Sequence, residues 1–283
     1  MISSLPVFGR WLFGLATAVV GVLQLCYADF VQMIFPAWPH TFPGYRVIAC
    51  LFSVFMVVVG LLAAAGKPVR RSVLILGGLL LVGIAVGQIP FLYLVVPYDK
   101  TNLGVWDAAL KELAIAGGAF LLAGLLPASR QEQGAFDRFL QGCIPMGRYF
   151  FCFTMMLYGY AHFLYHNFTV VLVPHWIPGA GFWVYATGAA LMAAGLSIGI
   201  RVWDRIAALL LGLMIFIWFW IIHLPHSLTN FPAGRGEMAA ALSALMFSGT
   251  AFMLTSTRYA RSKIRNRNSS IDREPFQQHS YNV

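Results

Sequence analysis

The sequence predicts an all-α, polytopic membrane protein with eight transmembrane helices, arranged as two parallel four-helix-bundle repeats. Hydrophobic residues make up 59% of the 283-residue chain and charged residues only 10%, with a mean hydropathy of +0.74. A soluble domain usually carries about 25% charged residues. Apolar runs long enough to cross a ~30 Å hydrocarbon core recur along the whole chain, and the two halves of the sequence resemble each other.

The two halves align at a nearly constant offset. Residues 21–30 (GVLQLCYADF) align with residues 159–168 (GYAHFLYHNF) at an offset of 138. Gln88 and His223, each followed two residues later by proline, align at an offset of 135. That second offset also pairs Gly60 with Gly195, Arg70 with Arg205 and Gly77 with Gly212. We therefore expect a unit of about 135 residues that occurs twice and has diverged.

Hydrophobic periodicity and length place four helices in each copy. We expect them over roughly 8–28, 45–66, 72–96, 105–126, 148–166, 182–200, 206–226 and 237–257. The first apolar run passes into the repeated motif, which favours a retained helix over a cleaved signal peptide. The predicted units are 8–127 and 148–257, joined by a cytoplasmic linker over 128–147 and followed by a basic, polar tail over 258–283.

The connections between the predicted helices also repeat. In each copy the first helix is followed by an outer loop with a Pro-x-Trp motif, at 36–38 and at 174–176. The prolines favour an ordered non-helical loop, and tryptophan is typical of the membrane interface. Short basic turns over 67–71 and 201–205 join the second and third helices. Cys26 and Cys50 fall near the same outer end, and a disulfide between them is left open.

The basic residues predict the orientation. One side of the predicted topology collects 15 of the 19 lysine and arginine residues, six of them in the tail. Because positive charge stays on the cytoplasmic side, we expect both termini in the cytoplasm, with a bacterial inner membrane as the expected location. The formal net charge of +9 then reflects topology. The expected partners are the lipid bilayer and a membrane-protein complex, and no basic fold indicates nucleic-acid binding.

Histidines mark the candidate site. Six of the seven fall on the predicted outer side, namely His40, His162, His166, His175, His223 and His226. His162 and His166 share one helix face, and so do His223 and His226. Polar residues at that depth are costly unless they face the bundle interior. A site between the fifth and seventh helices is therefore predicted, with His162 and His223 as its catalytic residues.

Three ligands fit such a site. A quinone could be held and protonated by the histidines, with Tyr165, His226 and Trp176 as cofactor-binding residues. Alternatively, His162, His166 and His223 could ligate a haem iron or copper. The structural alternative is that these imidazoles hydrogen-bond across helices. Because Gln24 and Gln88 occupy the positions of His162 and His223, a shared hydrogen-bonding role is expected and metal binding is disfavoured.

The few carboxylates have simpler explanations. Asp107 and Lys111 are four residues apart and are expected to pair on one helix face. Asp29 ends the first helix, where a cap or turn role is expected. Glu112 is expected to be a helix-start charge facing the outer solvent, with a buried membrane position as the alternative. Glu237 is expected to neutralise Arg235.

The second copy resembles the DoxX-like family of four-helix membrane proteins. The resemblance rests on Gly159-x-x-His162, Pro174-x-Trp176-x-Pro178, Trp183-x-Tyr185-x-x-Gly188, Arg205-x-Ala207-Ala208 and His223-Leu-Pro225. It implies a tandem pair of four-helix bundles, and for some members a quinone-linked function, as in the subunits of thiosulfate:quinone oxidoreductase. Family members often carry a glutamate shortly after the glycine of the second helix, whereas Gly188 is followed by Ala-Ala-Leu-Met.

The first functional hypothesis is an accessory or scaffold subunit of a redox or respiratory membrane assembly. The second is a quinone-interacting oxidoreductase subunit with a histidine site near the outer face. A haem- or copper-binding protein is the third. A transporter ranks last, because the predicted helices carry few charged residues at the membrane midplane.

Overall fold

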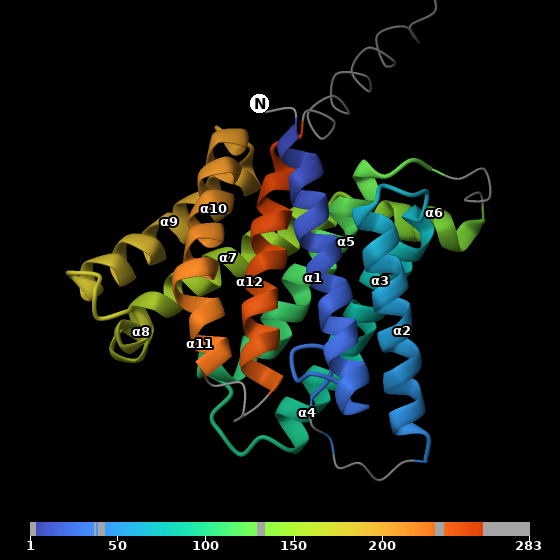
Figure 1. Ribbon diagram of the computed structural model, residues 1–283, viewed down its shortest axis with the longest axis horizontal. Helices are drawn as coiled ribbons and strands as arrows, with labels where there is room; N and C mark the ends of the chain where they lie inside the picture. The colour runs from blue at the N-terminus through green and yellow to red at the C-terminus, as the bar shows by residue number, and fades with distance from the viewer. Residues whose placement is uncertain (1–3, 37, 39–42, 129–133, 230–234, 257–283) are drawn as a thin grey trace, which may run out of the picture.

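The computed structural model describes residues 4–36, 38, 43–128, 134–229 and 235–256, and this part of the chain is helical without a strand (Figure 1). We call residues 5–125 the N-terminal half and residues 146–254 the C-terminal half. The predictions for His40, for the tail and for part of the linker lie outside the described residues.

The N-terminal half contains four long helical segments joined by shorter elements. In chain order they are α1 (Leu5–Tyr27), α2 (Tyr45–Ala64), α3 (Arg70–Gly83), the π-helical η2 (Ile84–Gln88), α4 (Ile89–Leu94), the 3₁₀-helical η3 (Leu103–Trp106) and α5 (Asp107–Leu125). α3, η2 and α4 form one uninterrupted span, Arg70–Leu94. These bounds agree with the predicted helices to within a few residues.

The C-terminal half follows after a short helix. Its elements are α6 (Ala135–Gly142), α7 (Met146–Leu164), α8 (His166–Leu172), α9 (Ala180–Ile200), α10 (Asp204–Trp218), the π-helical η4 (Phe219–His223), α11 (Leu224–Thr229) and α12 (Arg235–Leu254). α9 lies obliquely to α10 and α12, as Figure 1 shows. α6 falls within the predicted linker and is held to α3 by an ion pair of 2.9 Å between Arg71 and Asp137.

Seven helical segments in the described residues are long and apolar enough to cross a membrane, so the chain is an integral membrane protein by composition and architecture. The predicted fifth span corresponds to α7, which is absent from this set. Arg148, His162 and several tyrosines lower its mean hydropathy, although its 19 residues match the length of the others. The count of eight therefore stays a prediction for this helix.

Glycines bring the helices of each half into close contact. A Cβ atom on Gly21 in α1 would lie 2.7 Å from the backbone oxygen of Ser53 in α2. A Cβ atom on Gly159 in α7 would lie 2.5 Å from the backbone oxygen of Gly188 in α9. Since no such atom fits, glycine is required for both approaches. The two contacts involve residues that align with each other at offsets of 138 and 135.

Close contacts at glycines also join the two halves. A Cβ atom on Gly249 in α12 would lie 2.7 Å from the oxygen of Gly9 in α1, and one on Gly117 in α5 would lie 2.6 Å from the oxygen of Gly147 in α7. Gly117 and Gly249 are 132 residues apart, and Gly9 and Gly147 are 138 apart. The last helix of each half therefore packs on the first helix of the other through equivalent glycines.

Each half also contains a π-helical turn at an equivalent place. η2 ends at Gln88 and η4 ends at His223, and each turn is followed by a proline, Pro90 or Pro225. The proline ring would clash with the carbonyl four residues earlier in a regular α-helix. A wider π turn relieves this clash, and such turns are frequent at functional sites. The side chains of Gln88 and His223 thus project from corresponding positions, at the end of each π turn.

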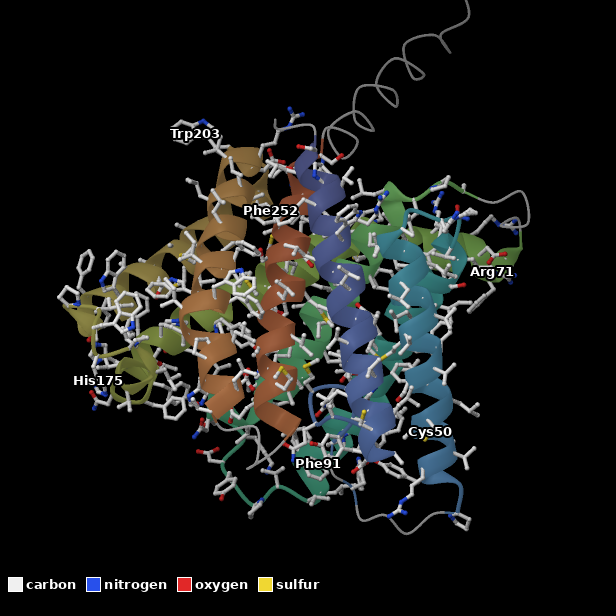
Figure 2. All side chains as sticks on the ribbon, in the orientation of Figure 1. Cys50, Arg71, Phe91, His175, Trp203 and Phe252 are labelled. Carbon is white, nitrogen blue, oxygen red and sulfur yellow. The ribbon has the colours of Figure 1, made fainter. Side chains whose placement is uncertain are left out.

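The basic turns lie at one end of the bundle. Figure 2 places Arg71 and Trp203 at the end where the N-terminus lies, and Cys50 and Phe91 at the opposite end. The buried Arg148 sits near the same basic end, where it donates to the Ile198 carbonyl at 2.9 Å and to Asp204 at 3.0 Å. Both Cys26 and Cys50 are free thiols, so the disulfide left open by the sequence is not formed.

Candidate functional site

A cavity of about 340 Å³ lies within the C-terminal half. Its walls come from α7, α8, α9, α10, η4 and α12, and the beginning of α5 closes one side. Most of the lining is apolar and includes Met155, Leu191, Met214 and Phe247. A largely apolar cavity of this size with a few polar groups is typical of a small-molecule site.

His162 and His223 line this one cavity, from α7 and from the end of the π-helical η4. Their side chains are close enough to interact electrostatically. The predicted site between the fifth and seventh helices therefore coincides with the cavity. The π turn contributes directly, because it sets the position from which His223 leaves its helix.

The hydrogen bond of His162 fixes its tautomer. Its Nδ1 lies 2.7 Å from the backbone oxygen of Tyr158, one turn earlier on α7. A carbonyl can only accept, so Nδ1 carries the proton and Nε2 of the neutral ring is left as an acceptor. The expected helix-to-helix hydrogen bond is wrong for His162, because its ring bonds to its own helix.

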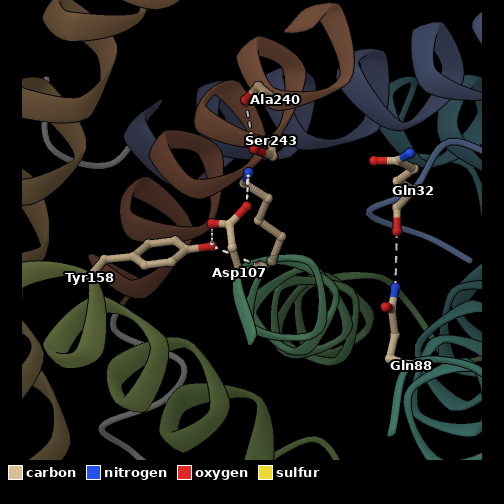
Figure 3. A network of polar contacts seen from close by, with 7 residues as sticks. Gln32, Gln88, Asp107, Tyr158, Ala240 and Ser243 are labelled. Carbon is tan, nitrogen blue, oxygen red and sulfur yellow. Dashed lines mark hydrogen bonds and ion pairs between the residues drawn. The ribbon is translucent and has the colours of Figure 1, made fainter. Parts of the chain in front are cut away.

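Asp107, Lys111 and Tyr158 form a polar corner of the cavity wall (Figure 3). The Lys111 ammonium lies 2.5 Å from one carboxylate oxygen of Asp107, which confirms the predicted pair. The Tyr158 hydroxyl donates to the other oxygen at 3.1 Å. Lys111 also lies within electrostatic range of His223. The corner therefore places donor groups beside the two histidines.

Tyr165 closes the cavity from the loop side. It lines the cavity, while its hydroxyl donates to the Asn102 side chain at 2.5 Å and accepts from the Gly104 amide at 2.9 Å. Since the hydroxyl is engaged outside the cavity, Tyr165 offers a bound molecule its ring. This contact ties the segment before α5 to the corner between α7 and α8.

The other predicted site residues lie elsewhere. The His166 ring stacks on Tyr185 with a centroid distance of 4.3 Å. His226 lies 3.4 Å from Glu237, and Trp176 is exposed, so neither lines the cavity. Among the described residues no group of three or more metal-ligating side chains lies together, and His166 does not join His162 and His223. Glu237 thus contacts His226, and its predicted pairing with Arg235 depends on a side chain outside the described ones.

The corresponding space in the N-terminal half is filled by the chain itself. In the segment after α1, residues 31–34, the side chains of Val31, Met33 and Ile34 are buried, whereas Gln32 is exposed. Gln24 accepts from the Val31 amide at 3.2 Å, and Gln88 donates to the Gln32 carbonyl at 3.0 Å (Figure 3). We call residues 31–34 the inserted segment. The two glutamines hold it by its backbone.

Glu112 is completely buried in the N-terminal half, so the expected position facing outer solvent is wrong. Its carboxylate turns toward Gly83 on the neighbouring helix α3. Neither Tyr158 nor the inserted segment was predicted from the sequence. The four-residue spacing of Tyr158 and His162 on α7 was a usable signal for the first. A short apolar stretch in a proline-bounded loop gives no comparable signal for the second.

No family model matches the chain, and no characterised protein or solved structure matches it. The resemblance of the second copy to the DoxX-like family therefore stays a prediction.

Proposed function

We propose that the chain is a tandem pair of four-helix membrane units of the DoxX-like kind, with α7 as the eighth transmembrane helix. The equivalent π turns and the equivalent glycine contacts within and between the halves support the duplication. Since each unit has an even number of spans, the copies share one orientation. The basic end is then cytoplasmic, and both termini lie there.

We further propose that the C-terminal half binds a lipid-soluble quinone, as quinone or quinol. The observation that supports this most directly is the convergence of His162 and His223 on one mostly apolar cavity. Apolar walls suit a ring and tail that partition into the membrane, and the few polar groups can orient the ring oxygens. The cavity is lined by Trp183 and Trp218 as well, which offer flat apolar surfaces.

The hydrogen-bonding groups match both redox states of such a ring. Nε2 of neutral His162 can accept from a quinol hydroxyl, because Nδ1 already donates to the helix. A quinone carbonyl needs a donor, which the Lys111 ammonium or an N–H of His223 can supply. Both histidines thus have a defined task in binding, and either can take a proton when the redox group of a partner protein accepts the electrons of a bound quinol.

An accessory subunit of a redox assembly is the second proposal. The side chains of Phe168 and Val171 on α8, and of Trp176 in the following loop, are more than two-thirds exposed, at 71%, 77% and 72%. They form an apolar surface beside the cavity that suits a neighbouring membrane protein. A partner seated there would place its redox group near a bound quinol.

Quinone binding can be measured through the tryptophans of the cavity. A short-chain quinone added to the purified protein should quench their fluorescence as it binds. We expect His162→Leu and His223→Leu each to weaken binding by roughly tenfold, which corresponds to the loss of about 1.4 kcal/mol of hydrogen bonding. The matched control is His226→Leu, because His226 lies outside the cavity.

A second variant tests whether binding needs the cavity itself, independently of its histidines. Ala244 lines the cavity, so Ala244→Phe should fill it and abolish binding while the protein stays folded. Ala189→Phe on the exposed face of α9 is its control. Unchanged affinity in Ala244→Phe and in both histidine variants would refute the quinone proposal. A tightly bound protein partner without quinone binding would favour the accessory function instead.

A further inference from the structure

The buried carboxyl of Glu112 has no role in the cavity of the C-terminal half. Its side chain is 0% exposed and lies in the interior of the N-terminal half. Neither carboxyl oxygen completes a hydrogen bond with a described residue, although the Gln88 amide lies near enough to interact. One oxygen occupies the space that a Cβ atom at position 83 would need, so Gly83 makes room for the carboxyl.

No nearby cation neutralises this carboxyl among the described residues. Lys111 precedes Glu112 on α5 but pairs with Asp107 on the other side of the helix, at the cavity wall. The groups that surround Glu112 from the neighbouring elements are Gln88 at the end of η2, Gly83 of α3 and the backbone of the inserted segment near Ile34. An ionised carboxylate in such surroundings costs far more free energy than a neutral acid.

The equivalent position in the other half shows that packing does not require a glutamate. Gly117 and Phe120 of α5 align with Gly249 and Phe252 of α12 at an offset of 132, and Gly77 and Gly212 touch these two phenylalanines in the same way. At the same offset, Ala244 aligns with Glu112. A helix of this unit therefore packs with alanine at the site, and the carboxyl is an added feature of the N-terminal half.

We propose that Glu112 is a membrane-embedded proton-binding site, in which the carboxyl is protonated at neutral pH and exchanges its proton with water. The ligand is the proton itself. Gln88 provides the adjacent polar group, since its amide bonds to Gln32 through one N–H and keeps its oxygen and second N–H for the carboxyl. Intramembrane carboxyls that face the protein interior commonly mark proton pathways. This proposal is independent of what the cavity binds.

Infrared spectroscopy of the full-length protein in a detergent without carbonyl groups tests the proposal. A protonated carboxylic acid has a carbonyl stretch above the amide band, and an ionised carboxylate lacks it. We expect this band in the wild type at neutral pH, its complete loss in Glu112→Gln, and a shift to lower frequency after transfer to D₂O. The matched control is Asp107→Asn, which should leave the band unchanged because Asp107 is paired with Lys111.

Labelling of glutamate with ¹³C assigns the band without a substitution, which covers the case that Glu112→Gln fails to fold. A glutamate band that shifts with the label and with D₂O supports the proposal. A missing band at neutral pH would mean that Glu112 is ionised and would overturn it. A band that D₂O does not shift after prolonged incubation would also overturn it, because the proton would then not exchange.

Discussion

The two halves of this protein have similar helical frames but different interiors. In the N-terminal half Gln24, Gln88 and Glu112 surround the inserted segment, whose side chains fill the bundle. At the aligned positions of the C-terminal half stand His162, His223 and Ala244, and they line a cavity of about 340 Å³. The frame of helices, glycine contacts and π turns is common to both, so a few side chains decide whether a unit is filled or hollow.

The chemistry of those side chains explains the difference. A glutamine amide both donates and accepts, so Gln24 and Gln88 can bond the backbone of a non-helical segment inside the bundle. A neutral histidine has one donor and one acceptor, and His162 uses its donor on its own helix. The segment aligned with residues 31–34 is then the end of α8, where Val171 is exposed and Thr169 and Leu172 only border the cavity.

The largest stability difference should come from the inserted segment. Ile34 is 3% exposed, so Ile34→Ala should lower the free energy of unfolding by about 2–5 kcal/mol through loss of packing and creation of a cavity. The aligned Leu172→Ala should cost roughly 1 kcal/mol, because that side chain is only half-buried beside existing space. Thermal or denaturant unfolding in detergent measures both. Equal losses would contradict the contrast between a filled and a hollow half.

Substitutions at the glycine contacts between the two halves should lower the free energy of unfolding equally, in contrast to Ile34→Ala and Leu172→Ala. Gly9→Ala and Gly147→Ala each push a methyl group into the backbone of the opposing helix, so each should destabilise the protein by about 1–3 kcal/mol. Gly142→Ala is the control, since a Cβ atom there meets nothing within 4 Å. A large effect at only one of the two interfaces would show that the frame is less symmetric than the contacts indicate.

The smallest effect concerns the closure of the cavity. Tyr165→Phe removes the hydroxyl that joins Asn102 and Gly104, and we expect a loss of about 0.5–1.5 kcal/mol. The exchange rate of the Gly104 amide hydrogen should rise modestly at the same time, because one of its two acceptors is lost while the Asn102 side-chain oxygen stays at 2.9 Å. Tyr160→Phe on an exposed part of α7 serves for comparison. No change at Gly104 would mean that the loop is held by other contacts.

Much of the frame was predictable because it depends on local patterns. Apolar length gave the helix positions, and a four-residue spacing gave the Asp107–Lys111 pair, which the structure confirms. The alignment of Gln88 with His223 was found in the sequence, whereas the π turn that ends at each of these residues was not predicted. The meeting of His162 and His223 was expected from their depth, but only packing showed that His166 and His226 lie outside the cavity.

By itself, the sequence determined that this is a helical membrane protein and where its helices begin and end, and it predicted which positions of the two halves correspond. These properties follow from residue hydrophobicity and from spacing along the chain, which are local. Only the tertiary structure decided that residues 31–34 fill one bundle, that the other bundle stays hollow, and that Glu112 is buried beside Gly83. Those outcomes depend on the space left between helices distant in the sequence, and no local pattern records that space.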